Sequence, residues 1–197
     1  MKMRAELVDL IEFTRKLYQS RDFIPLHEPL FIGREKTLVQ ECIDSTFVSS
    51  VGEFVYTFEQ QLTQYTGAKY AVASVSGTSA LHIALLLASV ERDTEVITQS
   101  LSFIATCNAI KYCGAVPVFI DVDKNNMSLS PKALREFLEA YGDLRDGKCY
   151  NSKTNKRLSA CVPMNTFGHS CKSDEIKSIC DQWNIPMIED AAESLGS

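Results

Sequence analysis

The sequence predicts an α/β fold, with a mainly parallel sheet and helices on both of its faces. From residue 70 onward, short apolar runs alternate with segments of helical periodicity, and this succession is typical of βαβ units and parallel sheets. The chain has 197 residues, 45% of them hydrophobic and 23% charged, so it is long enough and apolar enough to bury one substantial core. Residues 1–53 are expected to form a helical arm, and residues 54–197 the α/β domain.

Three helices are expected before the alternation begins. The first has residues that recur at helical spacing, namely Leu7, Leu10, Ile11, Thr14, Leu17 and Tyr18. The second covers residues 34–45, after a polar gap that contains Pro25 and Pro29. The third covers residues 54–65 and is expected to end at Gly67, because glycine readily closes a helix in the left-handed conformation.

The remaining elements alternate in type. Strands are expected at 70–74, 95–98, 116–120, 160–164 and 186–189. Helices are expected at 78–88, 103–112, 131–140 and 173–183, the third of them led by Pro131. Residues 141–159 are polar and basic without periodicity, so we expect an exposed loop or insertion there.

Composition excludes several classes of protein. The net charge is −5 and Lys and Arg form no long cluster, which argues against a nucleic-acid partner. The apolar run 80–90 is too short to span a membrane, and the first residues run into a helical pattern rather than a signal peptide. Seven cysteines without a Cys-x-x-Cys pair indicate reduced thiols in a cytoplasmic protein and no metal site.

The first candidate site segment follows the strand at 70–74. Ser76 and Thr78 supply hydroxyls, Gly77 allows close approach of a ligand to the backbone, and the next helix opens with free N–H groups that favour a phosphate. The alternative is an ordinary Ser or Thr cap on a buried helix. The segment matches neither Gly-x-Gly-x-x-Gly nor a P-loop, which disfavours a dinucleotide or a nucleoside triphosphate.

Two further strand ends carry candidate residues, and ligands of open α/β sheets gather at such ends. Phe103 could stack on a planar ring or face the core. Asp190, with Glu193 nearby, could hold a protonated ring nitrogen or could be a helix-capping or salt-bridged acid. A phosphate cradle, an aromatic ring and an acid for a heterocycle nitrogen together suit pyridoxal 5'-phosphate.

The same residues resemble a known family, the nucleotide-sugar aminotransferases of the DegT/StrS type, which are pyridoxal-phosphate enzymes of the aspartate-aminotransferase fold. The resemblance runs from about residue 25 to the last residue. It rests on five blocks: SSVG at 49–52 with Phe58 and Glu59, SGTSAL at 76–81, SFIATCNAI at 102–110, GAVPVFIDVD at 114–123 and IEDAAE at 188–193. Segments 26–29 and 42–50 further resemble the branch that aminates a UDP-linked 4-keto-6-deoxy-N-acetylhexosamine on the way to legionaminic-type sugars.

The resemblance implies roles for individual residues. Gly77 and Thr78 would hold the cofactor phosphate, and Phe103 would stack on the ring. Asp190 would pair with the pyridine nitrogen and Glu193 would lie near the ring hydroxyl. Ser50 and Gly52 would lie near a substrate site built across a homodimer.

The resemblance also implies the reaction. An amino acid, glutamate as a rule, gives its amine to the cofactor, which passes it to the keto carbon of a nucleotide sugar for surface polysaccharide or nonulosonate biosynthesis. Relatives need a Schiff-base lysine beyond the IEDAAE block. The sequence has four residues after Glu193 and none is lysine, so the 197-residue chain is expected to be inactive, a fragment without the lysine or the small C-terminal domain. Two alternatives stay open: a non-catalytic remnant that binds a partner, and a Rossmann-type nucleotide-sugar enzyme.

Overall fold

The chain forms two compact units, Met1–Ala71 and Val72–Ser197, in a computed structural model that describes residues 4–25 and 28–197. Leu26 and His27, which belong to one of the segments that indicated the sugar branch, lie outside the described residues. The predicted division at residue 53 stays a prediction.

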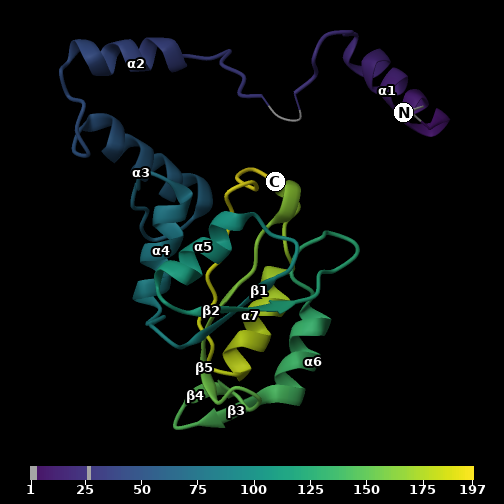
Figure 1. The fold of residues 1–197 in the computed structure, drawn as a ribbon. Helices are drawn as coiled ribbons and strands as arrows, with labels where there is room; N and C mark the ends of the chain where they lie inside the picture. Colours follow the sequence, from purple (N-terminus) through teal and green to yellow (C-terminus); the bar gives the residue numbers. More distant parts are fainter. Residues whose placement is uncertain (1–3, 26–27) are drawn as a thin grey trace. The chain divides into compact units, whose positions relative to one another are not determined.

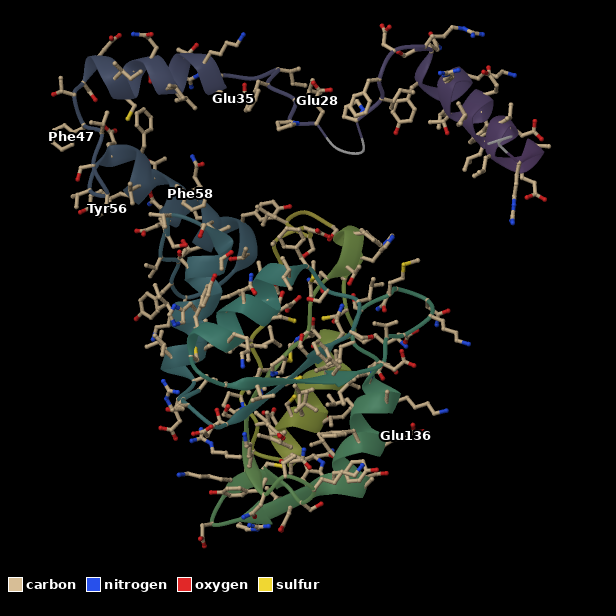
Figure 2. All side chains as sticks on the ribbon, in the orientation of Figure 1. Glu28, Glu35, Phe47, Tyr56, Phe58 and Glu136 are labelled. Atoms are coloured by element: carbon tan, nitrogen blue, oxygen red, sulfur yellow. The ribbon has the colours of Figure 1, made fainter. Side chains whose placement is uncertain are left out.

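The first unit contains three helices among its described residues: α1 (Ala5–Tyr18), α2 (Glu35–Asp44) and α3 (Glu53–Thr66) (Figure 1). All three were predicted, and Gly67 ends α3 at φ 73°, in the left-handed conformation that glycine tolerates. None of the three helices buries a side chain. Phe47, Tyr56 and Phe58 are examples of the large apolar side chains that this unit leaves exposed (Figure 2).

The described part of the second unit is built on a five-stranded sheet of order β2-β1-β5-β4-β3 (Figure 1). The strands are β1 (Glu95–Gln99), β2 (Val116–Ile120), β3 (Gly142–Arg145), β4 (Lys148–Asn151) and β5 (Lys156–Val162). β1 pairs in parallel with β2 and β5, whereas β4 pairs antiparallel with β5 and β3. The predicted α/β class is confirmed, and its sheet is mixed rather than parallel throughout.

Helices cover both faces of this sheet, as predicted. They are α4 (Gly77–Leu87), α5 (Ile104–Tyr112), α6 (Pro131–Tyr141) and α7 (Ser173–Gln182). Successive side chains of β1 point to opposite faces: Val96 packs with residues of α4 and α5, and Ile97 packs with residues of α6 and α7. Among the residues described, no helix combines the length and the apolar character needed to cross a bilayer.

The prediction of a strand at 70–74 is wrong. These residues form no strand, and the side chains of Tyr70 and Val72 are 75% and 86% exposed. Their apolar, β-branched composition favours a strand, but a strand also requires a neighbour with which to form a ladder of hydrogen bonds. No described segment takes that place beside them.

The prediction of a loop at 141–159 is also wrong, because most of this segment forms strands of the sheet. β3 and β4 form a hairpin in which Arg145 pairs with Lys148, and the two residues between them, Asp146 and Gly147, have φ of 50° and 75°. An Asp-Gly pair between two strands is a strong hairpin signal, since both residues must adopt positive φ in the favoured two-residue turn. The signal was present in the sequence but was hidden by the polar composition around it.

The strand expected at 186–189 is present only as two parallel bridges, Cys161 with Met187 and Met164 with Asp190. These bridges extend the sheet beyond β5 on the side away from β1. Because the pairing is parallel, it brings Asp190 to the edge where β1 and β5 also end.

Candidate cofactor site

The backbone around Asp190 is fixed by the end of β5. The Asp190 N–H donates to the carbonyl of Pro163 at 2.9 Å, and the Asp190 carbonyl accepts from the N–H of Asn165 at 3.1 Å. Asp190 is therefore a continuation of the sheet and not part of a free loop. Its side chain is 6% exposed.

A hollow of about 220 Å³ brings the first and the third predicted strand ends together. One wall comes from α4 and the other from the segment around Asp190; the lining residues are Gly77, Ala80, Leu81, Ala84, Ile188, Glu189, Asp190, Ala191 and Ala192. The structure therefore places Gly77 and Asp190, 113 positions apart in the sequence, on the same cavity.

The N-terminus of α4 retains two free donors. The Ser76 hydroxyl accepts a hydrogen bond from the Ser79 N–H at 3.2 Å, so Ser76 is the helix cap that the alternative interpretation predicted. The Ala80 N–H bonds to the Ser76 carbonyl, while those of Gly77 and Thr78 have no partner among the described residues. A Cβ added at Gly77 would meet no atom within 4 Å, so packing does not require glycine there. Capping and anion binding are compatible at this helix end, because they use different N–H groups.

The Asp190 carboxylate has a defined set of partners. Its Oδ2 accepts from the Thr106 hydroxyl at 2.6 Å and its Oδ1 accepts from the Ala192 N–H at 3.3 Å. It forms no ion pair with any described residue. The alternative in which Asp190 forms a salt bridge is therefore wrong. A buried carboxylate without a cationic partner is suited to pair with a positively charged group of a ligand.

Phe103 lies at the start of α5 and is 63% exposed, so the alternative that placed it in the core is wrong. Its N–H donates to the Met164 sulfur at 3.2 Å. This contact fixes the start of α5 against the end of β5. Phe103 does not line the hollow, and its stacking on a ring stays a prediction.

Glu193 and Glu189 bind the turn that follows β5. Glu193 Oε2 accepts from the Phe167 N–H at 2.7 Å, and Glu189 Oε1 accepts from Asn165 Nδ2 at 2.7 Å. Both contacts hold the 3-10 turn η1 (Thr166–Gly168) next to the Asp190 segment. The Glu193 carboxylate is thus hydrogen-bonded to the backbone of Phe167, and Glu193 does not line the hollow. Its role near a ring hydroxyl stays a prediction.

The predicted substrate residues belong to the first unit. Gly52 lines a separate hollow of about 520 Å³ within that unit, together with Cys42, Phe47 and six other residues. Ser50 is exposed and is not among the lining residues. Their contribution to a substrate site stays a prediction.

Gln99 and the role of Thr106 were not recognised from the sequence. Gln99 is fully buried, and its Nε2 donates to the Leu101 and Met164 carbonyls and to the Thr166 hydroxyl, at 2.9, 3.1 and 2.8 Å. Its Oε1 accepts from the N–H groups of Leu129 and Met164 at 2.9 and 3.0 Å. The available signal was a glutamine directly after the strand predicted at 95–98, because an amide that is buried at a strand end must find hydrogen-bond partners.

The fold and the candidate site lie in a part of the chain that matches a known protein family. The sequence model of the DegT/DnrJ/EryC1/StrS aminotransferase family matches residues 31–197, most of the chain. The chain belongs to this family. The assignment confirms the resemblance and replaces the Rossmann-type alternative. Proteins of this family that match the chain are named as pyridoxal phosphate-dependent aminotransferases, so the family is enzymatic and uses this cofactor.

Three similar proteins illustrate the relationship. EpsN of Bacillus subtilis, named as a pyridoxal phosphate-dependent aminotransferase, is 42% identical over 175 residues, 88% of this chain and 42% of EpsN. GDP-perosamine synthase of Escherichia coli O157:H7 is 34% identical over 89% of this chain and 44% of the synthase. The crystal structure of an aminotransferase from Psychrobacter cryohalolentis superposes with a TM-score of 0.73 at 28% identity, over 89% of this chain and 40% of that one. The chain thus spans less than half the length of these relatives.

Proposed function

We propose that this chain provides the cofactor-binding part of a pyridoxal-phosphate aminotransferase that acts on a nucleotide-linked 4-keto-6-deoxy sugar. The amino group would come from an amino acid, glutamate, and the product would enter surface polysaccharide or nonulosonate biosynthesis in the cytoplasm. Perosamine synthase among the relatives supports a nucleotide sugar as the acceptor. The motifs at 42–50 support the legionaminic-type branch.

The observation that carries the proposal is the hollow shared by α4 and Asp190. The cofactor has a phosphate at one end and a protonated pyridine nitrogen on its ring, and when bound it supplies an electron sink. The free N–H groups of Gly77 and Thr78 suit the phosphate, and the buried Asp190 carboxylate, which has no cationic partner among the described residues, suits the nitrogen. The anionic phosphate would thus meet N–H donors and the cationic ring nitrogen would meet a carboxylate, on the walls of one cavity.

Other residues would complete the site. Phe103, exposed at the start of α5, would stack on the ring, and Glu193 would approach the ring hydroxyl. Ser50 and Gly52 would contact the sugar across the interface of a homodimer. These roles rest on the resemblance of the motifs.

We further propose that these 197 residues bind the cofactor but do not complete transamination on their own. The hollow is lined by glycine, alanine, leucine, isoleucine and two acids, and no lysine is among its lining residues. A lysine amine is the group that forms the Schiff base and moves a proton between carbon atoms in this chemistry.

The test is a titration of the purified chain with pyridoxal 5'-phosphate, followed by the absorbance and fluorescence of the bound cofactor. We expect saturable binding at one equivalent that is lost in Asp190→Ala, with no transfer of amine from glutamate to a nucleotide keto sugar. Absence of saturable binding would refute the cofactor site. A stoichiometric adduct at a single lysine, trapped by borohydride and mapped by mass spectrometry, would refute the predicted inactivity.

A second candidate function is favoured by the first unit alone. Its helices α1, α2 and α3 bury no side chain although each carries large apolar residues, as is typical of a surface that binds another protein. In that case the chain would be a non-catalytic remnant that docks on an intact aminotransferase. Co-purification with such an enzyme would favour this function, and a stable monomer would count against it.

A further inference from the structure

The Thr106–Asp190 contact joins two elements that are far apart in the sequence. Thr106 Oγ1 donates to Asp190 Oδ2 at 2.6 Å, and the two side chains are 1% and 6% exposed. The distance lies within the usual range of hydroxyl–carboxylate bonds, which are shorter and stronger than bonds between neutral groups. Water does not compete strongly for either partner, because both are buried.

The Thr106 hydroxyl donates to Asp190 and not to a carbonyl of its own helix. A threonine in a helix can donate to a carbonyl of the preceding turn, and this local bond competes with longer-range contacts. Thr106 lies in the first turn of α5, where its N–H bonds to the Phe103 carbonyl at 3.2 Å, while its hydroxyl points across to the Asp190 segment. The bond therefore fixes the carboxylate of one element from the rigid end of another.

The position of α5 is itself constrained at this end. The Phe103 N–H and the Ser102 hydroxyl contact the Met164 sulfur at 3.2 and 3.5 Å, and Met164 bridges to Asp190. The start of α5 thus sets the place of both Phe103 and Thr106. Since Ala192 N–H holds the other carboxylate oxygen at 3.3 Å, rotation of the Asp190 carboxylate is opposed on both sides.

We propose that Thr106 is a positioning residue, which orients the Asp190 carboxylate toward the pyridine nitrogen of the cofactor. The inference rests on the proposed cofactor site and deepens it. Thr106 does not line the hollow, so it acts through Asp190 and not by contact with the ligand. Loss of its hydroxyl would leave the acid in place but free to rotate, which would weaken cofactor binding and the protonation of the ring nitrogen.

The test compares Thr106→Val, which keeps the shape and removes the donor, with Thr106→Ser, which keeps the donor. Each 197-residue variant is titrated with pyridoxal 5'-phosphate, and the ¹⁵N chemical shift of labelled cofactor reports protonation of the ring nitrogen. We expect the Kd to rise roughly tenfold in Thr106→Val, in keeping with the loss of a hydrogen bond to a charged group, and the ¹⁵N shift to move toward the unprotonated value. Thr106→Ser should stay within about twofold of the wild type, because the donor is retained.

Thr98→Val is the matched control, since Thr98 is also fully buried and its hydroxyl donates to the Val162 carbonyl at 2.9 Å and not to Asp190. It should leave both readouts unchanged. If Thr106→Val does not fold, Thr106→Cys takes its place, and its weak donor should give values between those of serine and valine.

The outcomes separate the two proposals. Normal affinity and a normal ¹⁵N shift in Thr106→Val, with binding intact in the wild type, would overturn the role of Thr106 alone. Equal losses in the serine and valine variants would also overturn it, because the methyl group would then be the cause. A wild-type chain that binds no cofactor would overturn the cofactor site and this inference together.

Discussion

The carboxylate of Glu193 holds the backbone of Phe167 in a conformation that phenylalanine rarely adopts. Phe167 has φ 56° and ψ 27°, and its N–H donates to Glu193 Oε2 at 2.7 Å. Left-handed backbone costs free energy in a residue with a Cβ, so the surrounding contacts must compensate. The turn next to the candidate site is therefore maintained by a side chain from the segment that carries Asp190.

Removal of the Glu193 acceptor should loosen this turn. In Glu193→Leu the Phe167 N–H loses its partner, and we expect the free energy of unfolding to fall by about 1 kcal/mol or less, because the pair is exposed and screened by solvent. Amide hydrogen exchange at Phe167 should become faster, whereas Glu193→Gln, which keeps an acceptor oxygen, should remain near the wild type. Unchanged exchange in Glu193→Leu would contradict the assigned contact.

Gly77→Pro tests the phosphate role of α4 without disturbing the helix. Gly77 is the first residue of α4 and proline is well tolerated there, while Ser76 already has the extended conformation that precedes proline, φ −163° and ψ 159°. The substitution removes one free N–H, so we expect about tenfold weaker binding of pyridoxal 5'-phosphate with an unchanged unfolding temperature. The control is Gly77→Ala, which keeps the N–H and places its Cβ in open space. Equal affinity in the proline variant would remove Gly77 from the phosphate site.

Replacement of Gln99 should be among the most destabilising substitutions in the second unit. Gln99→Met has nearly the same size, but it leaves the buried N–H groups of Leu129 and Met164 without their acceptor. We expect a loss of about 3 kcal/mol or more in the free energy of unfolding, measured by urea denaturation. Gln182→Met, at an exposed position of α7, should change it by less than about 0.5 kcal/mol. A mild effect at Gln99 would mean that water replaces the lost partners.

Cys149 should make stability fall at alkaline pH. Burial raises the pKa of the Cys149 thiol from 9.0 to about 11. Because the raised pKa belongs to the folded state, the stabilisation is complete below pH 9 and is lost as the pH rises from 9 to about 11, by on the order of 1–2 kcal/mol. Urea denaturation over this range should show a smaller decline for Cys149→Ala. Parallel curves for the two proteins would count against a perturbed thiol.

Local pattern accounted for most elements of the fold. Helical periodicity predicted α1 and α7 to within a few residues, and the apolar run at 116–120 matches β2. Two predictions failed for different reasons. The run at 70–74 has the composition of a strand, but its pairing depends on a neighbour that no local pattern specifies, and the Asp146-Gly147 turn was outweighed by the charged residues around it.

For the candidate site, the residue types and their positions indicated which chemistry is available: an acid at 190, a helix that opens at Ser76-Gly77-Thr78, and an aromatic residue at 103. These were recognisable because strand ends and helix starts are local features. The packing of the folded chain was needed to show that Gly77 and Asp190 share one hollow, that Thr106 donates to Asp190 and that Glu193 accepts from Phe167. Such contacts depend on the order of strands in the sheet and on burial, which arise when segments up to 113 residues apart pack together.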